Sequence, residues 1–134
     1  MIPTTSTILL TELEVETQPS KNHCMNIERN IISGYCDGLD AMRQVIYKIL
    51  NTERYQHIIY SWNYGVELLD LFGEPITYVA PEFQRRIVEA LVQDDRIISV
   101  DNFEFDISEK RTMNATFTVH TIYGDIQSEK AVNF

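Results

Sequence analysis

Apolar residues in the middle of the chain recur every three or four positions, which is the spacing of a helix with one buried face. The pattern is clearest in residues 36–52, "CDGLDAMRQVIYKILNT", where Asp37 is placed to cap the helix N-terminus. A second long helix is predicted over residues 80–95, "APEFQRRIVEALVQDD". Its Pro81 would lie in the first turn, where a missing N–H is tolerated.

The last third of the chain changes to a period of two, in which apolar and polar residues alternate as they do in half-buried strands. The alternation covers residues 102–108 and 112–121, and the polar residues between them predict a β-hairpin. A turn at Gly124 then leads into residues 126–134, which we predict as a third strand.

The remaining segments complete the prediction. Two short strands are expected within residues 23–35, and residues 54–65 are expected to be extended and aromatic. A short helix over residues 66–73 would end at Gly73, a suitable left-handed C-cap. The fold class is therefore α+β: two main helices plus a short helix packed on one face of a small antiparallel sheet, with a C-terminal β-hairpin.

Length and composition indicate a single domain. The 134 residues are enough for one core, and we assign residues 22–134 to the domain and residues 1–21 to a flexible N-terminal arm. The net charge of −9 disfavours nucleic acid and anionic membranes as partners, because both need a basic surface. No apolar run is long enough to span a bilayer, and the acidic N-terminal region does not resemble a secretory signal. A protein partner is the remaining expectation.

Catalytic and metal sites receive weak support from the residue pattern. Glu53 and Glu67 lie near aromatics, as the carboxylates of a glycoside hydrolase would, but no motif accompanies them. The three histidines and two cysteines lack the paired spacing of a zinc site, so we expect neither a metal nor a cofactor. Cys36 precedes a helix N-terminus that would lower its thiol pKa, although a buried, inert thiol is the simpler interpretation.

The segment from Tyr47 to Phe72 is rich in aromatic residues and contains the charged pair Glu53–Arg54. The pair is interpreted either as a local salt bridge or as a latch between subunits, and the residue pattern does not separate the two. The six aromatic residues suit an interface, where Tyr, Trp and Arg dominate, and about half of them are expected in the core.

The predicted strand at residues 115–124, "ATFTVHTIYG", contains no proline or lysine that would protect a sheet edge. It is therefore expected to accept a strand from another chain, unless residues 126–134 cover it. Combining these features, we predict a protein interface with nine residues. Eight of them follow from these features: Glu53, Arg54, Tyr55, Trp62, Tyr64, Thr116, Thr118 and His120. The ninth, Arg96, is implied by the family resemblance that is given next.

Three stretches carry a resemblance to a known family: "DGLDAMRQVIYKILNTERY", "YGVELLDLFG" and "LVQDDRIISVDNFEF". In order and spacing they resemble the XkdS-like tail proteins of Gram-positive phages and prophage elements. That group is similar to the lysozyme-like baseplate wedge proteins, or sheath initiators, of contractile tails. The elements shared with the wedge proteins correspond here to Glu53–Arg54, Tyr64–Gly65 and residues 95–97, although no proline lies between Arg54 and Gly65.

The resemblance implies a structural role without enzymatic activity, catalytic residues or a cofactor. It implies a component of a virion tail baseplate or phage-tail-like particle, made in the bacterial host cytoplasm and present in six copies around the tail. Its implied partners are the tail sheath protein, baseplate wedge proteins, and tail tube or hub proteins, and it would start sheath assembly by accepting sheath strands. Two alternatives remain open: a peptidoglycan-acting, lysozyme-like enzyme and a free-standing regulatory protein-binding module.

Overall fold

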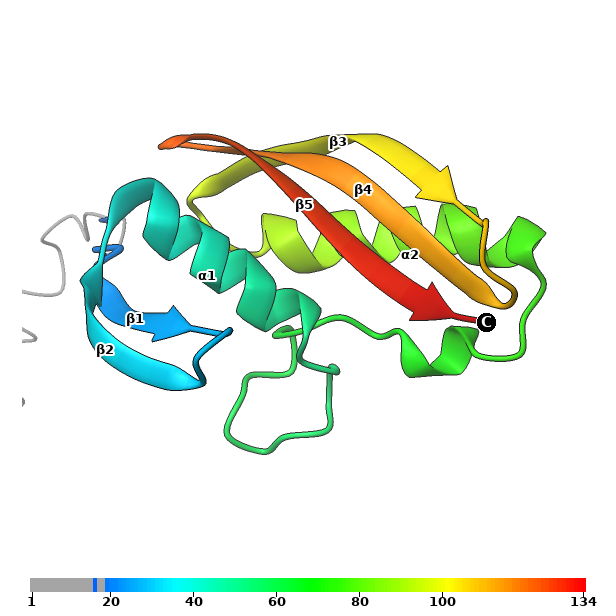
Figure 1. Cartoon of the computed structure of the whole chain (residues 1–134), viewed down its shortest axis with the longest axis horizontal. Coiled ribbons are helices and arrows are strands. Elements are labelled where there is room, and N and C mark those ends of the chain that lie inside the picture. The colour runs from blue at the N-terminus through cyan, green and yellow to red at the C-terminus, as the bar shows by residue number, and fades with distance from the viewer. Residues whose placement is uncertain (1–15, 17–18) are drawn as a thin grey trace, which may run out of the picture.

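The computed structural model describes residue 16 and residues 19–134, and the predicted N-terminal arm falls mostly outside these residues. Within that range the chain forms a three-stranded sheet, a separate two-stranded hairpin and two helices (Figure 1). The α+β class is thus confirmed, although the strands form two sheets where one was expected. The last residues of the predicted arm are attached to the domain, because Ser20 is buried and its hydroxyl lies 2.7 Å from the Tyr123 hydroxyl.

The first hairpin and helix follow the sequence pattern closely. Strands β1 (Asn22–Asn26) and β2 (Ile31–Cys36) pair antiparallel, as predicted. Helix α1 (Gly38–Leu50) begins after Asp37, whose carboxylate accepts a hydrogen bond from the backbone N–H of Gly38. The Gln44 side chain joins this helix to the hairpin, accepting from the N–H of Met25 and donating to the carbonyl of His23.

The second helix begins earlier than predicted. Helix α2 (Ile76–Val92) starts directly after Pro75, whose carbonyl accepts the N–H groups of Tyr78 and Val79. Pro81 therefore lies inside the helix, and its placement in the first turn was wrong. A proline at this position cannot donate the hydrogen bond to the carbonyl of Thr77, and the helix nevertheless continues to Val92.

The predicted short helix is reduced to a single turn. Only the 3₁₀ element η2 (Leu69–Leu71) forms, while Gly73 has the expected positive φ of 88°. The helix cannot begin at Val66, because the backbone of that residue is already bonded to Thr52 and Arg54. Residues 54–65, predicted to be extended, instead form a looped series of turns below α1 in Figure 1.

The large sheet has the order β3–β4–β5, from β3 (Ile97–Asp106), β4 (Thr112–Thr121) and β5 (Gly124–Asn133). The third strand is confirmed, and β3 begins five residues before the predicted strand. Because β4 is paired on both sides, the expectation that it offers an open edge was wrong. The edges belong to β3 and β5.

The core lies between the inner face of this sheet and the two helices. Met42 of α1, Phe83 of α2 and Phe117 of β4 have no exposed surface. Phe103 stacks on Phe117 and meets Phe105, which joins the edge strand β3 to the same core. None of the helices in residues 19–134 is long and apolar enough to cross a membrane.

Candidate interaction site

The two edges of the large sheet differ in regularity. The pairing of β3 with β4 is interrupted by two register shifts, and Asn102 in the second has a positive φ of 54°. The pairing of β5 with β4 runs without interruption through ten residue pairs, from Thr112 with Asn133 to Thr121 with Gly124. Bulges make an edge a poor template for a further strand, so β5 is the edge suited to strand addition.

The edge of β5 is free along its length in the described part of the chain. There, no backbone-to-backbone hydrogen bond joins β5 to any segment other than β4. In Figure 1, β5 is the strand of the large sheet that lies on the side of α1, whereas β3 lies at the opposite edge. An extended peptide could therefore bond to β5 in the manner of β-augmentation.

A groove follows this edge. It consists of two adjoining hollows of about 900 and 480 Å³, which share Leu50, Asn51, Lys130 and Ala131. One wall is β5, extended by Asp106 of β3 and by Asn114 and Thr116 of β4. The opposite wall is α1 from Arg43 to Leu50, followed by Glu53, Leu68, Leu69 and Phe72. We call this feature the β5 groove.

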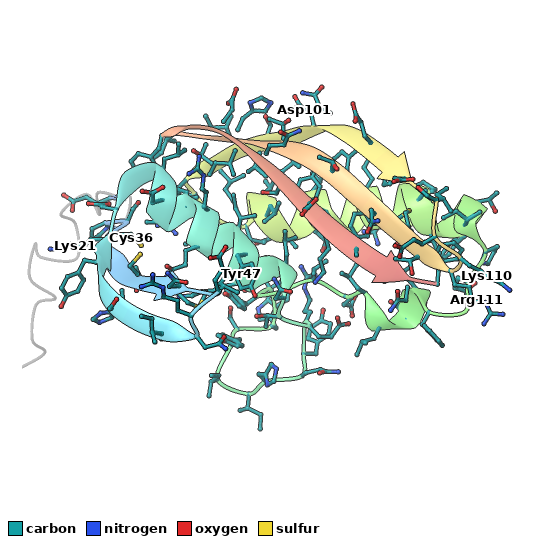
Figure 2. The ribbon with its side chains drawn as sticks, viewed as in Figure 1. Lys21, Cys36, Tyr47, Asp101, Lys110 and Arg111 are labelled. Atoms are coloured by element: carbon teal, nitrogen blue, oxygen red, sulfur yellow. The ribbon has the colours of Figure 1, made fainter. Side chains whose placement is uncertain are left out.

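The wall of the β5 groove opposite the strand has exposed apolar side chains. Leu69 and Phe72 are 63% and 71% exposed, and Tyr47 is 40% exposed. Figure 2 shows Tyr47 on α1. Ile46 and Leu50 line the groove as well, although they are almost completely buried in the core. A strand added to β5 would cover apolar surface on this wall.

The outer face of the sheet, which no helix covers, is acidic. Residues paired across the strands share a face, so Asp101 and Glu104 of β3 lie on the same side as Asp125 and Glu129 of β5. In the described strands, His120 is the basic side chain of this face. Its Nδ1 lies 2.7 Å from Asp125 and its Nε2 2.8 Å from Asp101. Hydrogen bonding to Asp125, and then to Asp101, raises the pKa of His120.

Glu53 and Arg54, predicted as interface residues, both bond within the domain. The Glu53 carboxylate accepts hydrogen bonds from the N–H groups of Leu68 and Leu69. Arg54 is 9% exposed and donates to the carbonyl of Gly65 at 3.2 Å and to the carboxylate of Glu89 at 3.1 Å. These contacts give the pair a structural function, and its role as a latch between subunits stays a prediction.

Gly65 belongs to the same contact between the end of α1 and the loop that follows it, and we call this contact the joint. It has φ +90°, and a Cβ atom at this position would lie 2.5 Å from the carbonyl oxygen of Thr52. The close approach allows the Val66 N–H to donate to the Thr52 carbonyl and the Arg54 N–H to donate to the Val66 carbonyl. A glycine is required here both by φ and by space.

The aromatic residues of residues 47–72 lie mostly outside the core. Tyr55 and Trp62 are exposed, whereas Tyr64 is partly buried, packs against the core and stacks on Tyr60 at 4.5 Å. Burial raises the pKa of Tyr64. The expectation that about half of the six would be core residues was wrong. Tyr55, Tyr60 and Trp62 lie in the turns of residues 54–65, which project away from the sheet and helices, and Tyr47 and Phe72 line the β5 groove.

The other predicted residues are found at two places. The Arg96 guanidinium donates two hydrogen bonds to the Asp94 carboxylate and one, of 3.2 Å, to the Ser20 hydroxyl, so it fixes the chain before β1. Thr116 and Thr118 lie with His120 on the outer face of β4. The structure therefore does not bring the nine predicted residues together into one surface.

Sequence reasoning overlooked the β5 groove, in particular Glu129 and Lys130. Residues 126–134 were predicted as a third strand, but that prediction does not reveal that the strand would form a free edge. Among the described residues, no three His, Cys, Asp or Glu side chains come together as a metal site. The pKa of Cys36 is raised, chiefly by burial and then by Cys24, so the alternative of a lowered thiol pKa was wrong; the thiol itself is only partly buried.

Comparison with known proteins decides the family. Residues 17–124 match the family model of the contractile injection system sheath initiator. The chain belongs to this sheath-initiator family. It is also 36% identical over 128 residues to the phage-like element PBSX protein XkdS of Bacillus subtilis (strain 168), with 90% of each chain covered. The resemblance to XkdS-like tail proteins is thereby confirmed.

Membership in the sheath-initiator family makes this chain a structural component of contractile tails. The match to the family model ends at residue 124, which is where β5 begins. The β5 groove therefore depends on a strand outside the matched range.

Proposed function

We propose that this sheath initiator lies where the baseplate meets the tail, in six copies, and starts the sheath by accepting an extended sheath strand along β5. The observation that carries the proposal is the uninterrupted, free edge of β5 beside the β5 groove. Strand addition supplies affinity through backbone hydrogen bonds, each contributing about 0.5–1.5 kcal/mol. Repetition around a ring would multiply this modest contribution.

The remaining partners are assigned to other surfaces. We propose that Tyr55 and Trp62, exposed on the loop below α1, contact baseplate wedge or hub proteins. Thr116, Thr118 and His120 belong to the acidic outer face, which would receive a more basic neighbour. The particle would be a phage tail, a prophage element or an R-type bacteriocin, assembled from protein made in the host cytoplasm.

Hydrogen exchange tests the position of the added strand. In the isolated protein, the β5 amides that point to the free edge should exchange quickly, while those bonded to β4 are protected. In assembled tails, the fast group should become protected, and the amides at the free edge of β3 serve as the control. If the β5 amides exchange equally fast in tails and in isolated protein, strand addition at this edge is refuted.

A matched pair of variants tests the same edge by assembly. Leu69 and Ile98 are 63% and 64% exposed, and they lie beside β5 and on β3, respectively. Leu69→Ser should reduce the amount of sheath retained on purified baseplates, whereas Ile98→Ser should not. Each should change the free energy of unfolding little, because surface substitutions usually stay within about 0.5 kcal/mol. Equal sheath retention by the two variants would contradict the assignment to β5.

A further inference from the structure

The strand β5 has an acidic and a basic side chain that would contact an added strand. Two adjacent residues in β5, Glu129 and Lys130, have opposite charges and lie on opposite faces of the strand. Glu129 pairs with Thr116 on the outer face, while Lys130 pairs with Ala115, which is fully buried. An added strand would meet one charge on each of its faces, at neighbouring positions.

Lys130 points into the groove, where the carboxylate of Glu53 lines the same hollow but already accepts hydrogen bonds from the N–H groups of Leu68 and Leu69. Lys130 lines both hollows, and its ammonium donates to the Asn51 side-chain oxygen at 3.1 Å. An ammonium group has three donors, so this bond leaves donors for an incoming group. Partial burial lowers the pKa of Lys130, opposed by the more distant charge of Glu53. A carboxylate placed opposite Lys130 would offset this desolvation.

Inward-pointing charges are a device by which natural sheets prevent indiscriminate pairing at an edge. The inward residues of β5 are Ile126, Ser128, Lys130 and Val132, and none of them is acidic. Two copies paired through β5 would therefore bring no carboxylate from the added strand to either lysine. The chain's own alternating stretch at residues 12–16 is also unsuitable, because its glutamates alternate with apolar residues and would face Glu129.

From this arrangement we infer that β5 selects a strand of another protein in which a carboxylate shares the face of the apolar residues, next to a basic residue on the opposite face. The carboxylate would meet Lys130 inside the groove, and the apolar residues would cover Leu69 and Phe72. The basic residue would meet Glu129 on the acidic outer face. This inference rests on the proposed function, and it adds the partner's pattern.

The charge pair also determines register. A strand that slips by one residue turns every side chain to the other face of the sheet. After a slip in one direction, the basic residue of the partner would face Lys130, and after a slip in the other direction, the acidic residue would face Glu129. Like charges directly opposite one another destabilise a pair of strands. The groove would thus accept one alignment of the partner and reject its neighbours.

Two capped peptides of identical composition test the inference. The first is Val-Thr-Val-Thr-Glu-Lys-Val-Thr, whose glutamate shares the face of the valines. The second is Val-Thr-Val-Thr-Lys-Glu-Val-Thr, in which the two charges exchange faces. The distinction holds for parallel and antiparallel addition alike, because it depends only on which face each charge occupies. Titration at low ionic strength, followed by NMR of the β5 amides, gives both affinities.

We expect the first peptide to bind about tenfold more tightly, as a charge-assisted hydrogen bond in a partly buried site would give. The double variant Glu129→Lys with Lys130→Glu keeps the net charge and should reverse the preference. Equal affinities, binding of neither peptide, or a preference that the double variant leaves unchanged would each overturn the inference. Exchange protection of β5 in assembled tails tests the proposed function separately, so failure of one is distinguishable from failure of the other.

Discussion

Replacing Gly65 with alanine should destabilise the domain more than replacing Gly73 with alanine. Both glycines have nearly the same positive φ, +90° and +88°, so both variants carry the strain of a side chain in left-handed backbone, about 1–2 kcal/mol. Both also reduce the entropy of the unfolded chain to a similar extent. The two positions differ in the space around the added Cβ atom.

At Gly73 nothing lies within 4 Å of a Cβ atom, whereas at Gly65 the carbonyl oxygen of Thr52 lies 2.5 Å away. The backbone at residue 65 has to move, which weakens two bonds of the joint: Val66 N–H to Thr52 and Arg54 N–H to Val66. At about 1 kcal/mol for each bond, the total loss at Gly65 is about 3–4 kcal/mol, against about 1–2 kcal/mol at Gly73.

Urea unfolding followed by circular dichroism measures both losses, and near-native spectra before the transition show that the variants fold. Losses of equal size at the two positions would refute the reasoning, because they would mean that contact with Thr52 contributes nothing. A loss of stability at Gly65 that is larger by about 2 kcal/mol would indicate that the hydrogen bonds of the joint are the reason why a glycine follows Tyr64.

Two further predictions concern charged side chains. The stability contributed by His120 should be fully present below its ordinary pKa of about 6.5 and lost as the pH rises through the raised value in the folded protein, because only imidazolium donates from both ring nitrogens. The difference in free energy of unfolding between wild type and His120→Gln should therefore be larger at pH 6 than at pH 9, and a constant difference would contradict this. Arg86→Met should cost about 1–3 kcal/mol, because the largely buried guanidinium donates to Asp70, Glu82 and a backbone carbonyl. Arg85→Met, at an exposed position of the same helix, should cost under about 1 kcal/mol, and the same urea measurement compares the two.

The parts of the fold that depend on neighbours in sequence were predictable. Helix α1 was recognised from its apolar stripe and from Asp37, and β4 was recognised from its alternation. Both signals arise from the geometry of one element, so they need no knowledge of the rest of the chain. The order of the strands does not have this property, because alternation is the same in a central strand and in an edge strand.

The candidate site was predicted less well for the same reason. Glu53 bonds to backbone groups 15 and 16 residues away, which no local pattern indicates. Lys130 becomes notable only once β5 is placed at an edge beside α1. The resemblance to a known family supplied the functional class, whereas the surface that would perform the function emerged from the three-dimensional arrangement.

The uninterrupted register between β4 and β5 also has a mechanical consequence. Tension applied along the strands loads all ten residue pairs at the same time, whereas tension applied perpendicular to the strands opens the pairs one after another from one end. A single backbone bond contributes little, so resistance to force comes from sharing it among many bonds. In a contractile tail, the pairing of β4 with β5 therefore resists force best when these strands run parallel to the direction of pull.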